Sequence, residues 1–260
     1  MYKKELQLAI ELAREASEVL RKDFYEPRPT PVIDENGVHL AIDHEIEQLI
    51  KGKVKLQFPD HRFLGEEEGA SGTESDYRWI VDPIDGTSNY FCHNPFFCVS
   101  IALAYKDEIV MGVIDAPIID ESYALEKGKN LFINDKEILN IESKSFDKIV
   151  IGGRSYEARC LNVSNYHIDN ENTYSKIEMG AAALELAYVA SGKIQCYMVE
   201  GIKDWDVAAG VLMVREMGGK VVNWKGQDWN FGDDRLIAGR DDIVEKLLEK
   251  VVSTSKNSSA

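Results

Sequence analysis

Apolar residues recur every three or four positions near the start of the chain, and this spacing predicts a helix over residues 3–24. Three prolines between residues 27 and 31 end the pattern. The residues that follow them read as a loop or hairpin that turns at Asn36-Gly37. A second helix is predicted from about residue 43 to 54, so the chain begins with two helices joined by a turn-rich segment.

Short apolar runs follow, and their lengths and polar boundaries predict strands. The polar residues 66–77 read as a solvent loop, and Lys106-Asp107 and Asn134-Asp135 read as turns. This pattern is typical of an α+β unit with an antiparallel sheet. The strands are expected at residues 62–65, 78–82, 97–105 and 109–116.

After about residue 147, short apolar runs alternate with helical patterns, as in an α/β unit. The helical patterns are "GAAALELAYVASG", "DVAAGVLMVREMGG" and "DDIVEKLLEKVV". We therefore predict an α/β protein of two packed subdomains. They are an α+β half over 1–145 and an α/β half over 146–252, with a disordered tail at 253–260.

Composition narrows the class of protein. The net charge of −15 over 260 residues makes nucleic-acid binding an unfavoured function. No apolar run approaches the ~18 residues of a membrane span, and the N-terminal stripe carries charges that a secretory signal would lack. We expect a cytoplasmic protein without a membrane partner. The four cysteines show no zinc spacing and read as reduced thiols.

Acidic residues gather at four places, and each has a simple structural interpretation. The run of three glutamates from residue 66 can be a solvated surface, and Asp85-Gly86 can be a turn. Asp43 and Asp206 can each be a helix N-cap, a role worth ~1 kcal/mol. Taken singly, these interpretations are adequate.

Taken together, the carboxylates indicate a divalent cation. Asp82 and Asp85 stand three residues apart where a predicted strand ends, and crowded carboxylates repel unless they share a cation. Hard oxygen ligands suit Mg²⁺, whereas the five histidines are scattered and no EF-hand spacing occurs. Gly86-Thr87-Ser88 follow at a place where a short helix could begin and offer backbone N–H groups to a phosphate. The pattern therefore points to phosphoryl chemistry.

Other phosphate-handling motifs are missing from the sequence. There is no GxxxxGK[ST], no GxGxxG and no cysteine followed by five residues and arginine. Asp204 and Asp206 match the spacing of an aspartyl-phosphate nucleophile, but the preceding "EGIK" is not the buried strand that such a nucleophile needs.

Three segments now support a resemblance. "GEEEG", "WIVDPIDGTSNY" and "WDVAAG" resemble, in order and approximate spacing, the signature segments of the inositol monophosphatase family of Mg²⁺-dependent, lithium-sensitive phosphatases. Flanking segments such as "GAAALELAYVASG" agree, so the resemblance covers about residues 3–250. It implies a layered α/β/α/β/α sandwich, two or three Mg²⁺ ions per site and a homodimer.

The resemblance also implies the metal ligands. Glu66, Asp82 and the Ile84 carbonyl would hold one ion. Asp82, Asp85 and Asp206 would hold a second ion, so that Asp82 bridges the two. This would explain why acidic residues gather in a chain that is already acidic.

Further roles follow from the same resemblance. Thr87, polarised by Asp43, would orient and deprotonate the attacking water at the ion held by Glu66. Backbone N–H groups of Gly86 and Thr87 would hold the phosphate, and Glu67 would support the ligands or bind occasionally. The substrate region would comprise Gly180, Ala181, Ala182, Glu200 and Asp206.

The substrate region departs from the family pattern. Glu178 and Ala181 replace the usual basic and hydroxyl residues. The family glutamate seven residues before Asp206 falls on Val199, and Glu200 comes one place later. A small phosphorylated polyol or sugar, inositol 1-phosphate first, is the expected substrate. Fructose-1,6-bisphosphatase, histidinol-phosphatase and 3′(2′),5′-bisphosphate nucleotidase activities are alternatives, as is a non-catalytic regulatory protein of the kind that binds transcription machinery.

Overall fold

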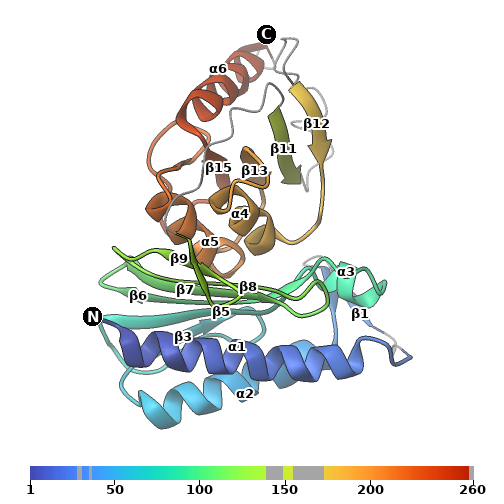
Figure 1. The fold of residues 1–260 in the computed structure, drawn as a ribbon, viewed down its shortest axis with the longest axis vertical. Helices are drawn as coiled ribbons and strands as arrows, with labels where there is room; N and C mark the ends of the chain where they lie inside the picture. Colours follow the sequence, from blue (N-terminus) through green and yellow to red (C-terminus); the bar gives the residue numbers. More distant parts are fainter. Residues whose placement is uncertain (28–30, 35–36, 139–148, 155–172, 258–260) are drawn as a thin grey trace.

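Helices and sheets alternate in five layers (Figure 1). The computed structural model describes residues 1–27, 31–34, 37–138, 149–154 and 173–257. Two helices cover one face of an eight-stranded sheet, two more lie between that sheet and a five-stranded sheet, and the last helix covers the outside. This confirms the predicted α/β/α/β/α sandwich. The helices are α1 (Lys3–Asp23), α2 (Ala41–Gln57), α3 (Thr87–Phe91), α4 (Ala182–Ala190), α5 (Asp204–Glu216) and α6 (Asp241–Asn257).

The first two helices form as predicted because each has one apolar face to bury. The apolar stripe of α1 packs against the large sheet through Leu8, Leu12 and Leu20. The buried face of α2 carries Ile46 and Ile50, but it also carries two acidic residues, which become important at the site.

The eight-stranded sheet has the order β10-β9-β8-β7-β6-β5-β3-β4. All neighbouring strands are antiparallel except β3 and β5. The hairpin at Lys106-Asp107 is confirmed, since both residues have positive φ. Residues 66–77 are not only a loop, because Gly69–Ser71 add an edge strand. The strands are β3 (Arg62–Gly65), β4 (Gly69–Ser71), β5 (Tyr77–Asp85), β6 (Cys98–Tyr105), β7 (Glu108–Ala116), β8 (Glu121–Glu126), β9 (Leu131–Ile133) and β10 (Lys136–Ile138).

The second half forms the predicted α/β layers. Its sheet has the order β12-β11-β13-β15-β14, and a separate hairpin, β1 (Val32–Asp34) with β2 (Gly37–His39), lies in the first half. The short strands β12 and β14 were not predicted from sequence. The strands of this sheet are β11 (Ile149–Arg154), β12 (Thr173–Ile177), β13 (Cys196–Glu200), β14 (Lys220–Val222) and β15 (Arg235–Gly239).

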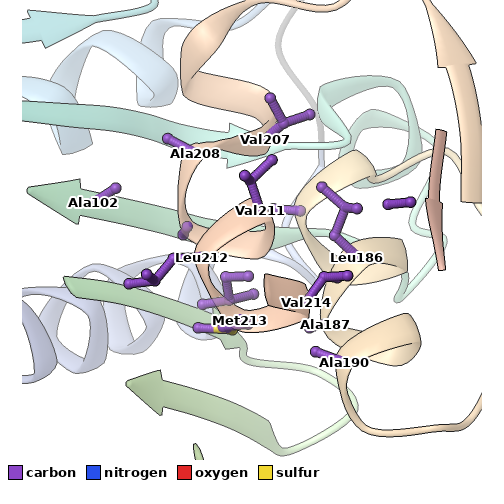
Figure 2. Packing of buried hydrophobic residues seen from close by; sticks show 14 of the residues in the cluster. Ala102, Leu186, Ala187, Ala190, Val207, Ala208, Val211, Leu212, Met213 and Val214 are labelled. Atoms are coloured by element: carbon purple, nitrogen blue, oxygen red, sulfur yellow. The ribbon is translucent and has the colours of Figure 1, made fainter. Parts of the chain in front are cut away.

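Helices α4 and α5 pack together and join the two halves. Figure 2 shows Val211 and Val214 of α5 beside Leu186 of α4. Gly112 of β7 allows the close approach of α5, because a Cβ there would lie 2.9 Å from the Ala209 Cα. The Asp206 end of α5 is thereby fixed relative to the large sheet.

Some sequence predictions fall outside the described residues or need correction. Asn36, Cys160 and the expected boundary near residue 145 lie outside the described ranges. The prediction of a disordered tail at 253–260 was partly wrong, since α6 continues through residues 253–257. Within the described residues, no helix is long and apolar enough to cross a membrane. The other three cysteines are free thiols.

Candidate active site

The end of β5 was predicted at residue 82, but the strand continues to Asp85 through a bulge. Asp82 pairs with Ser100, and Asp85 pairs with Cys98. Two residues of β5 therefore lie opposite one residue of β6 at this point, as in a β-bulge. In a regular strand, residues three apart face opposite sides. The bulge places both aspartates on the side that faces α4 and α5.

Asp85 connects β5 to the start of α4. Its carboxylate accepts hydrogen bonds from the backbone N–H groups of Ala182, at 3.0 Å, and Ala183, at 2.7 Å. These donors satisfy part of its charge. Burial and the nearby Asp206 nevertheless raise the pKa of Asp85 to about 7. Asp85 therefore holds the second half of the chain against the first at the predicted site.

The carboxylate of Asp82 is repelled by those of the other predicted ligands. Its side chain is only 2% exposed, and its Oδ1 accepts the Ile84 N–H at 2.9 Å. Burial raises the pKa of Asp82 well above its usual range, and repulsion from Glu66, Asp85 and Asp206 adds to the rise. The four predicted acidic ligands thus lie close enough to interact, although they come from three separate segments.

Glu66 and Glu67 lie on the connection between β3 and β4. This connection is held by Glu47, a residue that was not predicted from sequence. The fully buried carboxylate of Glu47 accepts the N–H groups of Glu67 at 2.9 Å and Glu68 at 3.0 Å. A Cβ on Gly65 would lie 2.2 Å from that carboxylate, so a side chain at this position would displace Glu47. The sequence feature that could have identified Glu47 is an acidic residue on the apolar face of a predicted helix.

Glu68 is different from its two neighbours. It is exposed and accepts a hydrogen bond from Lys51 at 2.6 Å. The solvated-surface interpretation therefore holds for Glu68, and Glu66 and Glu67 are half-buried.

Asp43 and Asp206 occupy equivalent positions on α2 and α5. Neither is the N-cap residue, because each lies three residues after it. Asp43 accepts a hydrogen bond from the Leu40 N–H, and Asp206 accepts one from the Lys203 N–H, both at 2.7 Å. Burial raises the pKa of Asp43 to about 8, and the charges of Glu67 and Glu66 add to the rise. The Oδ1 atom of Asp43 is buried and has no hydrogen-bond partner among the described residues.

The turn after β5 has the geometry that the sequence suggested. Gly86 has φ of 96° and precedes α3, which begins at Thr87. A Cβ on Gly86 would lie 3.1 Å from the Phe96 carbonyl and 3.2 Å from the Gly180 carbonyl. The Thr87 hydroxyl donates a hydrogen bond to the Ile84 carbonyl at 3.0 Å. The hydroxyl therefore bonds to this carbonyl, and not to Asp43, which was expected to polarise it.

Asn89 is a second residue that the sequence analysis missed. Its Nδ2 donates to the Met179 and Phe96 carbonyls, both at 2.6 Å. Gly180 has positive φ, and a Cβ there would lie 3.0 Å from the same Nδ2. Asn89 therefore ties the segment before α4 to the turn around Gly86. Of the predicted substrate residues, Gly180 and Ala181 belong to that segment, and Ala182 is the first residue of α4.

Glu200, predicted to bind substrate, and the two positions that depart from the family pattern, Val199 and Glu178, do not share one environment. Val199 is 1% exposed and belongs to the apolar core. Glu200 is also buried, with its carboxylate 3.7 Å from Arg235 Nε on the paired strand β15. Glu178 is exposed. A substrate role for Glu200 stays a prediction.

The donor chemistry fits a hard divalent cation. The carboxylates of Glu66, Asp85 and Asp206 lie near enough to Asp82 to raise its pKa, and such oxygen donors suit a hard cation. The orphaned Oδ1 of Asp43 is another oxygen without a described donor. Within the described ranges, no three His, Cys, Asp or Glu side chains already stand in positions that could hold an ion.

Comparison with known proteins identifies one family. The profile of the inositol monophosphatase family matches residues 1–259. The chain is 34% identical over 254 residues to an inositol-1-monophosphatase of Mesorhizobium japonicum, covering 95% of both chains. It is also 34% identical over 255 residues to the Nus factor SuhB of Pasteurella multocida, again covering 95% of both.

Solved structures give the same result. A crystal structure of the extragenic suppressor protein suhB from Bartonella henselae has a TM-score of 0.87 and 32% identity. That match covers 95% of this chain and 98% of the other. An IMPase of Thermotoga maritima has a TM-score of 0.84 and 27% identity, covering 97% and 99%.

Proposed function

Because the chain belongs to the inositol monophosphatase family, we propose that it is a Mg²⁺-dependent phosphomonoester hydrolase that acts on inositol 1-phosphate or a related polyol or sugar phosphate. Family membership implies a metal-dependent phosphatase; the ion and the substrate are our proposal. The observation that carries it is the repulsion of Asp82 by Glu66, Asp85 and Asp206. Such crowding is costly unless cations lie among the carboxylates.

The residues that would hold two or three Mg²⁺ ions are Glu66, Asp82, Asp85, Asp206 and the Ile84 carbonyl. The ions would supply Lewis-acid stabilisation of the charge that develops on the phosphoryl group. Asp82 would contribute most to their binding.

The chain itself would position the reactants. The N–H groups of Gly86 and Thr87 would bind phosphate oxygens, because the left-handed turn at Gly86 keeps the backbone free of a Cβ. The Thr87 hydroxyl would orient the attacking water. Asp43, whose Oδ1 has no hydrogen-bond partner among the described residues, would receive the proton when it is ionised, and burial raises its pKa to about 8.

A panel of substrates tests the proposal. We would measure phosphate release from inositol 1-phosphate, fructose 1,6-bisphosphate, adenosine 3′,5′-bisphosphate and histidinol phosphate, with Mg²⁺ and with excess EDTA. We expect Mg²⁺-dependent turnover with preference for inositol 1-phosphate. Turnover that persists in EDTA would contradict the metal mechanism, and preference for another substrate would contradict only the substrate assignment.

The names of the relatives support a second candidate. Several are named Nus factor SuhB, including those of Pasteurella multocida and Haemophilus influenzae. A regulatory binding role for this chain would depend on its surface, not on its carboxylates. Asp82→Asn separates the two roles, because a biological function that survives this change is not catalysis. A homodimer, implied by the family resemblance, and a cytoplasmic location, expected from the N-terminal sequence, remain proposals.

A further inference from the structure

The C-terminal end of α1 contacts α3, the short helix that follows the turn at Gly86. Figure 1 shows both at the same end of the large sheet. A helix of five residues is not stable by itself, because its few hydrogen bonds do not offset the cost of nucleation. The position of α3, and of the turn before it, is therefore set by what its residues contact.

Tyr90 is the residue that connects α3 to α1. It is fully buried, and its backbone N–H donates to the Gly86 carbonyl at 3.0 Å. Its ring lies edge-on to Phe97 and beside Phe24, with centroid distances of 4.9 and 6.0 Å. Its hydroxyl donates to the carboxylate of Asp23, the last residue of α1, and hydrogen bonds to charged groups are the stronger kind. One residue thus joins the turn to α1.

His93 makes a second connection, just after α3. Its Nδ1 lies 2.6 Å from the Phe24 carbonyl, and because a carbonyl can only accept, Nδ1 is the donor. The His93 backbone N–H donates to the Tyr90 carbonyl at 3.1 Å. Both side-chain bonds join residues that are more than sixty positions apart in the chain. Packing of α1, rather than the local sequence, therefore fixes the turn at Gly86.

We propose that Tyr90, held by Asp23, is a positioning residue for the turn formed by Gly86 and Thr87. The inference rests on the proposed function, in which the N–H groups of these two residues bind phosphate oxygens. Tyr90 acts on the turn through its backbone bond to Gly86. Without the hydroxyl, α3 and the turn are held less firmly. Hydrogen bonds weaken steeply when their geometry is poor, so the affinity for phosphate falls.

Calorimetry on the full chain, with inorganic phosphate as the ligand and Mg²⁺ present, tests the inference. We expect Tyr90→Phe to bind phosphate about three- to tenfold more weakly than the unaltered chain does. Tyr123→Phe is the matched control, because Tyr123 is also fully buried and its hydroxyl also donates to a carboxylate, that of Glu121, at 2.7 Å. It lies on β8, which two strands separate from β5. The control should lose stability in urea, yet bind phosphate as the unaltered chain does.

Variants of Asp23 test whether the hydroxyl acts through this carboxylate. Asp23→Ala should weaken phosphate binding, and adding Tyr90→Phe to it should weaken binding no further. Asp23→Asn keeps an oxygen acceptor and should restore most of the affinity. The inference is overturned if Tyr90→Phe binds phosphate as tightly as Tyr123→Phe, or if the effects of Tyr90→Phe and Asp23→Ala add. Absence of phosphate binding by the unaltered chain would contradict the proposed function as well.

Discussion

Asp82 and Asp85 are three residues apart on β5, yet they pair with Ser100 and Cys98, which are two residues apart on β6. The bulge between them places both carboxylates on one side of the sheet. Without it, one of the two would face α1 and α2. The local backbone, not the spacing of the aspartates alone, thus produces the acidic cluster.

Asp82→Asn should lower turnover by at least about 100-fold, because it removes a carboxylate proposed to hold the ions. The same change should raise the thermal unfolding temperature without metal, since it removes the repulsion on a buried charge. Mg²⁺ should then stabilise the variant less than the unaltered chain. Turnover and thermal unfolding, each with Mg²⁺ and with EDTA, measure both effects. A loss of less than about tenfold in turnover would contradict the assigned role.

Glu47→Gln should raise the Mg²⁺ concentration needed for half-maximal activity. Its carboxylate holds the N–H groups of Glu67 and Glu68, and an amide can accept from them with one oxygen only. The loop that carries Glu66 should therefore be less well fixed. Titration of activity with Mg²⁺ measures the change. Glu45→Gln, on the exposed face of the same helix, is the control and should leave the curve unchanged.

Asn89→Ala should raise KM more than it lowers kcat. The change removes both hydrogen bonds that tie the segment around Gly180 to the Phe96 carbonyl, at a cost of about 1–3 kcal/mol in stability. The substrate region should loosen while the carboxylates stay in place. Steady-state kinetics and urea unfolding test this, with the exposed neighbour Ser88→Ala as control. An equal fall in kcat and kcat/KM would instead place Asn89 in the chemical step.

The stability of the fold should fall as pH rises, partly because of Glu185. This residue is fully buried on α4, and burial raises its pKa from 4.5 to about 8. The folded state thus keeps a proton that the unfolded state has lost. The stabilisation is complete below pH 4.5 and is lost as pH rises through about 8.

Glu185→Gln replaces the ionisable carboxyl with a neutral amide. The free energy of unfolding of the variant should therefore depend less on pH. We would measure unfolding in urea with EDTA between about pH 5 and 8.5, a range that spans the raised pKa. The free energy of unfolding of the unaltered chain, minus that of the variant, should decrease with pH by a few kcal/mol. A difference that stays constant across this range would show that Glu185 ionises normally.

The sequence alone identified most of the elements and the acidic clusters, and the family resemblance added the layered sandwich and the predicted ligands. Helical spacing identified α1, α2, α4 and α5 because one face of each is apolar and must be buried. Asp82, Asp85 and Asp206 stood out because acidic residues cluster beside a strand end and a helix start. These signals are local, so a short window of sequence contains them.

Only the tertiary structure decided how these groups meet. Glu47 and Asn89 act on backbone groups of other segments, and Asn89 reaches a carbonyl 90 residues away. The β5 bulge depends on the register with β6, and the environment of Glu200 depends on Arg235 across the sheet. Contacts of this kind arise when separate elements pack, and packing is set by the whole chain rather than by any one segment.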